Sequence, residues 1–276
     1  MKIYAAVTAA FLLASNATPV RAQAVAVRER EGLVHGFLSL STLEGKALAD
    51  GDLFQTVDGE RVTSRLAFRF RDGSTSDETS VFTQGKTFRL ISNHVVQKGP
   101  AFPRPFLDSS IDVPGGHVKV RYTDDGKEQT IDEKMELPPD LANGMILTLL
   151  KNISPQAAKT VVPMLAIQPK LRMVKLEFTP VAKDGFRTAG LGREATRYNV
   201  KVDIGGVTGV LASLLDKVPP DSSVWILGGE APAFVKSEAP LFVGGPLWRI
   251  ELVSPVWPEK PAASAADKKD DEKKKD

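Results

Sequence analysis

The sequence predicts a mainly β protein of the α+β class, built as a strongly curved antiparallel sheet or half-barrel with two apolar helices on its concave face. Three observations lead to this prediction: two-residue alternation of apolar and polar side chains, glycine turns between the alternating runs, and two segments with helical spacing of apolar residues. Alternation leaves one face of each strand dry and the other wet, which favours an antiparallel sheet over a parallel sheet buried on both faces.

The clearest alternating run covers residues 62–71, where Leu66, Phe68 and Phe70 fall on one face and arginines on the other. Two pairs of runs flank short turns that contain glycine, which predicts two β-hairpins. The hairpins are 79–83 with 87–96, around Gln84-Gly85-Lys86, and 118–123 with 129–137, around Asp124-Asp125-Gly126; further strands are expected over 160–167, 171–179, 196–204, 224–227 and 247–253.

Two segments are predicted to be helical. After Pro138-Pro139-Asp140, apolar residues recur at three- and four-residue spacing as far as Ile153, just before a proline. The same spacing runs from Val207 to Val218, between a Gly-Gly and a Pro-Pro pair. Burying one such side chain is worth about 1.5 to 3 kcal/mol, so both helices are expected to lie against the dry face of the sheet.

The chain is expected to divide into a signal peptide over 1–24, a single β-rich domain over 25–257 and a disordered Lys/Asp/Glu-rich tail over 258–276. Lys2, an apolar run of about a dozen residues and the small residues Ala22 and Ala24 form the three-part pattern of an exported protein. Cleavage is expected after Ala24, with Ala22 as the alternative site. The alternative interpretation of the segment is an uncleaved N-terminal anchor. The tail has nothing to bury, which is typical of a solvated segment.

Composition limits the compartment and the partners. The chain has no cysteine, so a disulfide and a lipid-modified cysteine are both excluded. Once Lys2 and Arg21 leave with the signal peptide, the 36 basic residues of the chain fall to the number of its acidic residues, 34. A balanced charge gives no reason to expect nucleic acid as a partner. We expect a soluble periplasmic or secreted protein without an integral membrane segment after cleavage, and its protein partners cannot be identified from the sequence.

No motif assigns a catalytic residue, a cofactor or a metal. Gly85-Lys86-Thr87 ends like a phosphate-binding loop but lies in a hairpin turn, and Gly205-Gly206-Val207-Thr208-Gly209 has the wrong glycine spacing for a dinucleotide fingerprint. His35, His94 and His117 are far apart in the sequence, so a metal site or a catalytic triad would have to be assembled by the fold.

A short internal echo occurs near the C-terminal end. The segment Glu230-Ala231-Pro232-Ala233-Phe234-Val235 returns as Glu238-Ala239-Pro240-Leu241-Phe242-Val243. Because proline is confined to strand edges and bulges, each copy is predicted to be an edge segment with its phenylalanine pointing inward. A functional alternative places these segments, with Trp225 and Trp248, at the mouth of a binding cavity.

Four stretches, 94–100, 137–144, 224–234 and 248–252, resemble an uncharacterised secreted protein family of Gram-negative bacteria. The resemblance spans most of the mature domain and implies no assigned activity and no functional residues. A looser likeness is to periplasmic lipoprotein-carrier proteins (LolA-like), and it implies a curved half-barrel sheet that wraps helices around a hydrophobic cavity.

These observations favour a non-enzymatic periplasmic binding or carrier protein for an apolar, lipid-like ligand. The predicted ligand-binding residues are Met145, Leu149, Leu211 and Leu215, which lie at the centres of the two apolar helix faces. Two alternatives stay open: an envelope interaction or scaffold protein with a filled core, and a hydrolase with a spatially assembled site. A carrier should contain an apolar cavity, a scaffold none, and a hydrolase a cleft where polar groups converge.

Overall fold

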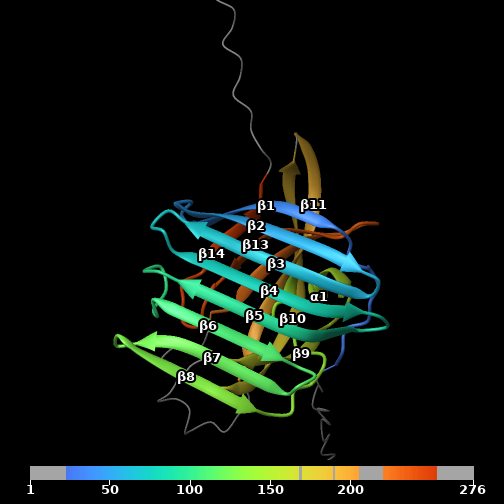
Figure 1. Cartoon of the computed structure of the whole chain (residues 1–276). Coiled ribbons are helices and arrows are strands. Elements are labelled where there is room, and N and C mark those ends of the chain that lie inside the picture. The colour runs from blue at the N-terminus through green and yellow to red at the C-terminus, as the bar shows by residue number, and fades with distance from the viewer. Residues whose placement is uncertain (1–22, 168–169, 189, 205–219, 254–276) are drawn as a thin grey trace, which may run out of the picture.

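In the computed structural model, the strands of the described residues form one 14-stranded antiparallel sheet with the order β8-β7-β6-β5-β4-β3-β2-β1-β14-β13-β12-β11-β10-β9 (Figure 1). The structure describes residues 23–167, 170–188, 190–204 and 220–253. The elements are β1 (Val34–Thr42), β2 (Ala47–Asp58), β3 (Arg61–Phe70), β4 (Thr75–Gln84), β5 (Phe88–Lys98), β6 (Phe106–Asp112), β7 (His117–Asp124), β8 (Lys127–Lys134), α1 (Ile146–Asn152), β9 (Thr160–Ala166), β10 (Arg172–Thr188), β11 (Leu191–Asp203), β12 (Ser222–Leu227), β13 (Ala233–Ala239) and β14 (Trp248–Leu252).

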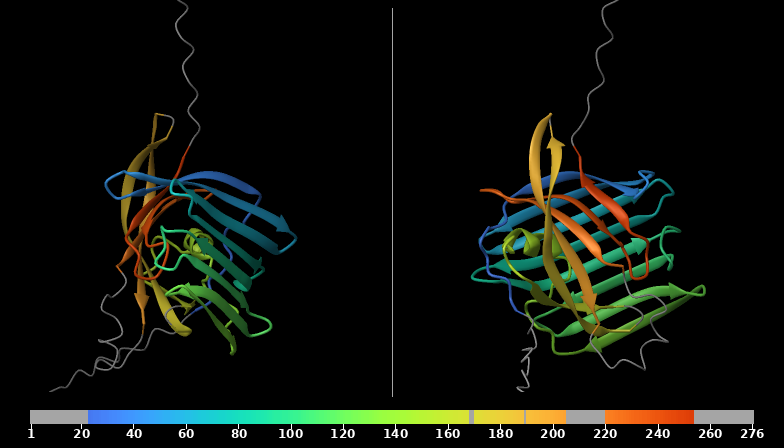
Figure 2. Two further views of the ribbon diagram at one scale, coloured as in Figure 1. Left: turned by 60° about the vertical axis from the view of Figure 1, so that its left-hand side comes forward. Right: turned by 180° about the vertical axis from the view of Figure 1, so that it is seen from behind.

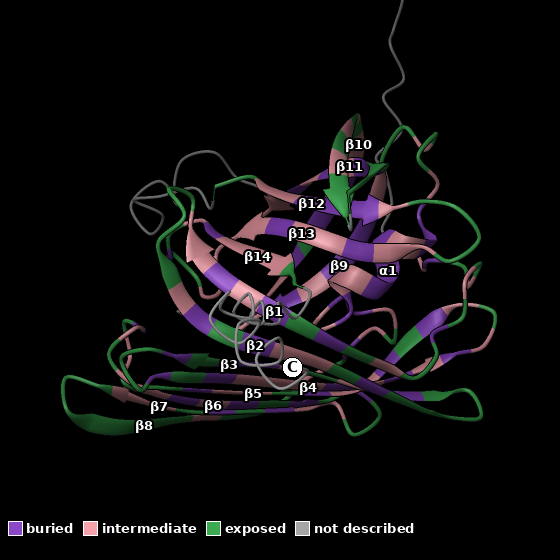
Figure 3. Ribbon diagram, turned by 90° about the horizontal axis from the view of Figure 1, so that it is seen from above, coloured by how far each residue is buried: buried purple, intermediate pink, exposed green. Residues whose placement is uncertain are grey.

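The sheet consists of two meanders joined in its middle. Strands β1 to β8 pair in sequence order, as do β9 to β14, and the first strand then pairs with the last, with Leu38 opposite Leu252. The outermost strands are therefore β8 and β9, and the chain between them carries α1. Figures 2 and 3 show the two meanders facing each other, with α1 between them. This arrangement confirms the predicted mainly β, antiparallel fold, as a large sheet that is not closed into a barrel within the described residues.

The predicted hairpins are present. β4 pairs with β5 and β7 pairs with β8, each across the expected turn. Asp125 and Gly126 both have positive φ, 47° and 73°, which matches the backbone of a tight two-residue hairpin turn. In β3 the predicted faces are also confirmed, because Phe68 and Phe70 are buried whereas Arg69 is exposed.

The prediction of two helices is not supported. The first begins only at Ile146 and has seven residues, and the second, over 207–218, lies outside the described residues. The first is short because Gly144 has a φ of +65°, which a continuing α-helix excludes. The residues before it form hydrogen bonds with β9 instead. The Ala142 N–H donates to the Pro163 carbonyl at 2.8 Å, and the Asn143 side chain makes two hydrogen bonds of 2.9 Å with the backbone of Leu165.

The core lies between the two meanders and around α1. Alternate residues of the strands point inward, so buried and exposed bands follow one another along each strand in Figure 3. Aromatic pairs fill the centre, such as Phe82 against Phe88 with ring centroids 6.1 Å apart. From the helix, Leu149 and Leu150 enter this core, and the Tyr198 hydroxyl of β11 donates to the Ile153 carbonyl at 2.7 Å.

An N-terminal arm over 23–33 is tied to the ends of the strands and to α1. Asn152, in the last turn of α1, accepts hydrogen bonds from the Arg28 and Glu29 N–H groups at 2.8 and 2.7 Å. Further along the arm, the buried Glu31 carboxylate accepts hydrogen bonds from Lys151 at 2.6 Å and from Gln55 at 2.9 Å. Through Glu31, the arm therefore links α1 to strand β2 of the N-terminal meander.

The two outer strands are protected in different ways. β8 has the sequence KEQTIDEK and exposes charged side chains, which disfavour pairing with another chain. β9 is covered on its open side, because the Gln23 N–H donates to the Val161 carbonyl at 2.9 Å and residues 142 and 143 bond to the same side further along.

The prediction of edge segments for the internal echo is wrong for its first copy. Strand β13, which contains Phe234, pairs with β12 on one side and β14 on the other. The prolines lie just outside it, Pro232 before and Pro240 after, where their missing N–H groups interrupt no ladder bond. Phe234 does point inward, as predicted, and is buried.

Most of the predicted signal peptide and the whole segment 258–276 lie outside the described residues, so export and tail disorder stay predictions. Among the described helices, none is long and apolar enough to cross a membrane.

Candidate functional site

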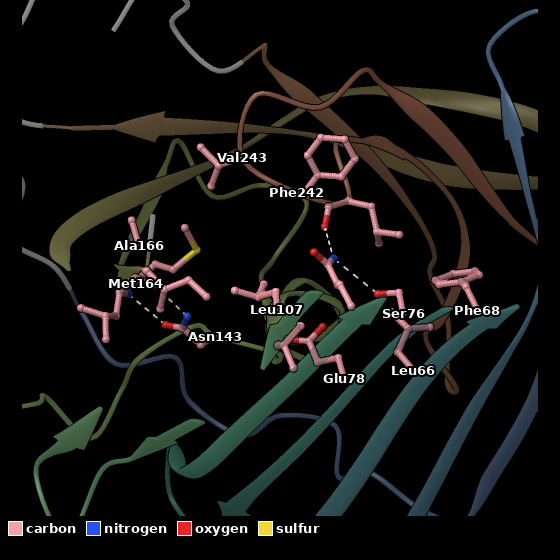
Figure 4. Close-up of a pocket in the computed structure, with 15 residues that line it drawn as sticks. Leu66, Phe68, Ser76, Glu78, Leu107, Asn143, Met164, Ala166, Phe242 and Val243 are labelled. Atoms are coloured by element: carbon pink, nitrogen blue, oxygen red, sulfur yellow. Dashed lines mark hydrogen bonds between the residues drawn. The ribbon is translucent and has the colours of Figure 1, made fainter. Parts of the chain in front are cut away.

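A cavity of about 220 Å³ lies between the two meanders (Figure 4). It is larger than the cavity of about 150 Å³ that holds benzene in an engineered protein, and smaller than the roughly 300 to 1,000 Å³ of sites for drug-sized molecules. One wall comes from β3 to β6 and the other from β9 and the segment after β13. Its lining residues are Leu66, Phe68, Ser76, Glu78, Val95, Gln97, Leu107, Asn143, Met164, Leu165, Ala166, Ile167, Leu241, Phe242 and Val243.

The walls of the cavity are mostly apolar because it lies between the inward faces of the two meanders. Leu66 and Phe68 are alternate residues of β3 and point to the same side, while Met164 and Ala166 do so in β9. Phe242 also lines the cavity and packs edge-to-face on Phe102 and on Trp248, with ring centroids 5.8 and 5.7 Å apart. Side chains of both meanders therefore line the cavity, which opens to solvent beside the exposed Val243.

One carboxyl group, that of Glu78 in β4, faces this apolar space. Its Oε1 accepts a hydrogen bond of 2.9 Å from the Asn93 amide, which also donates to the Ser80 hydroxyl at 3.0 Å. Glu78 is half-buried, and its side chain is one of those that line the cavity. Burial raises the pKa of the Glu78 carboxyl, and the hydrogen bond from Asn93 opposes that shift.

The positions of these polar groups are fixed by close packing. Gly144 has positive φ and lies directly against the Ser80 hydroxyl and the Asn93 amide, so that a Cβ at this position would overlap both. The glycine that delays the start of the predicted helix thus allows the chain to pass over the Glu78 cluster, which we define as Glu78, Ser80 and Asn93.

Gln97 joins the two meanders at the cavity. Its amide donates to the Leu241 carbonyl at 3.1 Å and approaches the Ser76 hydroxyl at 3.5 Å (Figure 4). This hydrogen bond holds the segment 241–243 over the cavity. The second copy of the internal echo therefore contributes to the cavity lining, whereas Phe234 of the first copy, Trp225 and Trp248 are not among the lining residues.

The outer face of the N-terminal meander carries charges that pair across strands. Each of the three histidines lies next to an aspartate of a neighbouring strand: His35 by Asp52 at 3.2 Å, His94 by Asp108 at 2.9 Å and His117 by Asp132 at 2.6 Å. The hydrogen bond from His35, with another from Arg69, lowers the pKa of Asp52, and the hydrogen bond from His117 lowers the pKa of Asp132.

A second hollow, of about 500 Å³, lies over this outer face at β3 to β5. Most of its charged groups are already paired, Arg65 with Asp77 in the hollow itself, and Arg69 and His94 with aspartates of neighbouring strands. No histidine is among the residues that line the inner cavity, and the described residues contain no group of three or more His, Asp or Glu side chains placed to hold a metal ion. We therefore take the inner cavity as the candidate site.

The predicted site residues do not line this cavity in the described part of the chain. Met145 and Leu149 are 1% and 2% exposed and belong to the packed core. Leu211 and Leu215 lie outside the described residues. A role of these four residues in ligand binding stays a prediction.

The residue that sequence reasoning missed is Glu78. The alternation along β4 carried a signal for this residue. Glu78 shares a strand face with Ser80 and Phe82, and Phe82 is fully buried. A glutamate two residues before an inward serine lies on the dry face of its strand, where an acid is uncommon and marks a candidate site.

Comparisons with known proteins give no family for the chain. No protein-family model matches it, and no curated protein matches it. Among solved structures, a β-barrel-like protein of the domain of unknown function DUF1849 from Brucella abortus is similar over 81% of this chain and 98% of that one, with 10% identity and a TM-score of 0.46.

Proposed function

We propose that this protein is a non-enzymatic binding or carrier protein whose apolar ligand occupies the cavity between the two meanders. One observation carries the proposal: a pocket of about 220 Å³, lined mostly by apolar side chains, that lies between the two meanders and opens to solvent beside the exposed Val243. Concave, mostly apolar pockets with a few polar groups are typical of sites for small molecules. A scaffold with a completely filled core gives no reason for such a space.

The dimensions of the cavity limit the ligand. A cavity of about 150 Å³ holds benzene, which has six carbon atoms. In proportion to volume, the space here accepts a chain of about eight carbon atoms. The ligand is therefore a short apolar molecule or the end of a longer chain. A location in the periplasm, as the signal-peptide pattern suggests, is part of the same proposal.

The hydrolase alternative is supported less well. The cavity lining contains a serine, Ser76, and an acid, Glu78, but the three histidines lie on the outer face of the sheet. A serine nucleophile needs a base within hydrogen-bond reach. The polar groups of the cavity instead bond to one another and to the backbone.

Calorimetric titration with heptanol tests the proposal. Ala166→Phe places a ring in the cavity and should reduce heptanol affinity at least tenfold, because the ligand would have to share the remaining space. Val181→Phe adds the same ring at an exposed position of β10 and serves as the control. If the unaltered protein takes up no heptanol, or if Ala166→Phe binds as tightly as the control, the proposal is wrong.

A further inference from the structure

We infer that the ligand carries a carbonyl group, and that this carbonyl accepts a hydrogen bond from the protonated Glu78 side chain at the cavity wall. The inference rests on the proposed function and specifies its ligand class: a short acyl group, as an ester, an amide or an acid.

The first step is the orientation of the carboxyl group. Its Oε1 is occupied by the Asn93 amide, while Oε2 has no hydrogen bond to a described residue. Asn93 cannot turn away freely, since it also donates to Ser80 and since Gly144 packs against it. Only one oxygen of Glu78 is thus available to a molecule in the cavity.

The second step is the charge of the group. Glu78 is the one titratable side chain among the 15 residues that line the cavity, and no lysine or arginine is among them. Glu78 is half-buried against apolar side chains and has no cation among its cavity neighbours, which favours the neutral form of its carboxyl group. The raised pKa of Glu78 agrees with that conclusion.

The third step is complementarity. A neutral carboxyl group whose Oε1 accepts from Asn93 carries its proton on Oε2, which then donates toward the cavity. The best partner for this donor in an apolar space is a carbonyl oxygen attached to an apolar chain. An alkylammonium ligand would require the ionised carboxylate, and its binding would improve, not weaken, as the pH rises.

The test compares three probes of one chain length, methyl heptanoate, heptane and heptylamine, on the full mature chain. Binding is followed by the methyl resonances of the methionines in NMR spectra: Met164 lines the cavity, and Met145 in the core is the internal control. One hydrogen bond is worth about 1 kcal/mol, so the ester should bind about fivefold more tightly than heptane. As the pH rises through the raised pKa of Glu78 and the carboxyl group loses its proton, that preference should disappear.

Two variants separate the possible outcomes. Glu78→Gln keeps a donor without a titrating group, so the ester preference should persist and become independent of pH. Glu78→Leu removes the donor, so heptane should still bind and the ester preference should be lost. Probe binding without an ester preference, or a preference for heptylamine that grows with pH, overturns this inference alone. If no probe moves the Met164 resonance, the proposed function itself fails.

Discussion

Removal of the Lys151 ammonium group should destabilise the protein strongly. Lys151 Nζ lies 2.6 Å from the Glu31 carboxylate, and the two side chains are 18% and 4% exposed. In Lys151→Met the carboxylate keeps its hydrogen bond of 2.9 Å from Gln55 but loses its cation. Breaking a buried ion pair from one side costs about 3 to 5 kcal/mol. We expect about 3 kcal/mol, the lower end, because water reaches part of the lysine.

Urea unfolding of the full mature chain measures this loss as a lower midpoint with an unchanged slope. Lys159→Met is the matched control, since Lys159 pairs with Glu177 at 2.9 Å while 36% of its side chain is exposed; that change should cost less than about 1 kcal/mol. Adding Glu31→Gln to Lys151→Met should restore most of the stability, because no buried charge is left. If Lys151→Met alone is no less stable than Lys159→Met, the reasoning is refuted.

Further predictions concern the packing and the ends of the chain. Gly144→Ala should lower the free energy of unfolding by at least about 1 to 3 kcal/mol, because φ is +65° there and the new Cβ overlaps Ser80. Urea titration measures this loss, and an unchanged midpoint would contradict the structure. Met145→Lys places a charge in a packed core and should cost more than about 4 kcal/mol, so a variant that melts like the unaltered protein would be unexpected. Deletion of 258–276 should change stability by less than about 0.5 kcal/mol in calorimetry, and a larger drop would show that the segment docks. Mass spectrometry of protein exported by a Gram-negative host should find Val25 at the N-terminus, and an intact Met1 would exclude cleavage.

Local patterns in the sequence predicted the local structure well. The alternation around Phe68 gave the correct faces of β3, and the Asp124-Asp125-Gly126 turn gave the correct hairpin. Such features depend on residues that are close in the sequence, so one chain suffices to predict them.

Long-range pairing was not predictable in the same way. The contact of β1 with β14 joins residues more than two hundred positions apart, such as Leu38 and Leu252, and no local pattern specifies it. The late start of the predicted helix has the same cause, because Asn143 bonds to Leu165, in a strand that follows later in the chain. Helical spacing alone cannot predict that competition between a helix and a strand edge.

The apolar pocket between the two meanders is lined by strand side chains and the segment 241–243. The predicted site residues Met145 and Leu149 belong to the packed core instead, and a role of these residues, or of Leu211 and Leu215, in ligand binding stays a prediction. The polar group of the site, Glu78, sits on the dry face of a strand where a sequence pattern treats an acid as an exception.

Native mass spectrometry of protein purified from the cells that produce it tests the central claim most directly. We expect the mature chain to carry a small non-covalent adduct that denaturation releases, and the adduct to be absent from Ala166→Phe while Val181→Phe retains it. Fragmentation of the released molecule should reveal an acyl group on a short apolar chain. A protein that has the bare mass of its mature chain, and that takes up no heptanol when titrated, would contradict the account.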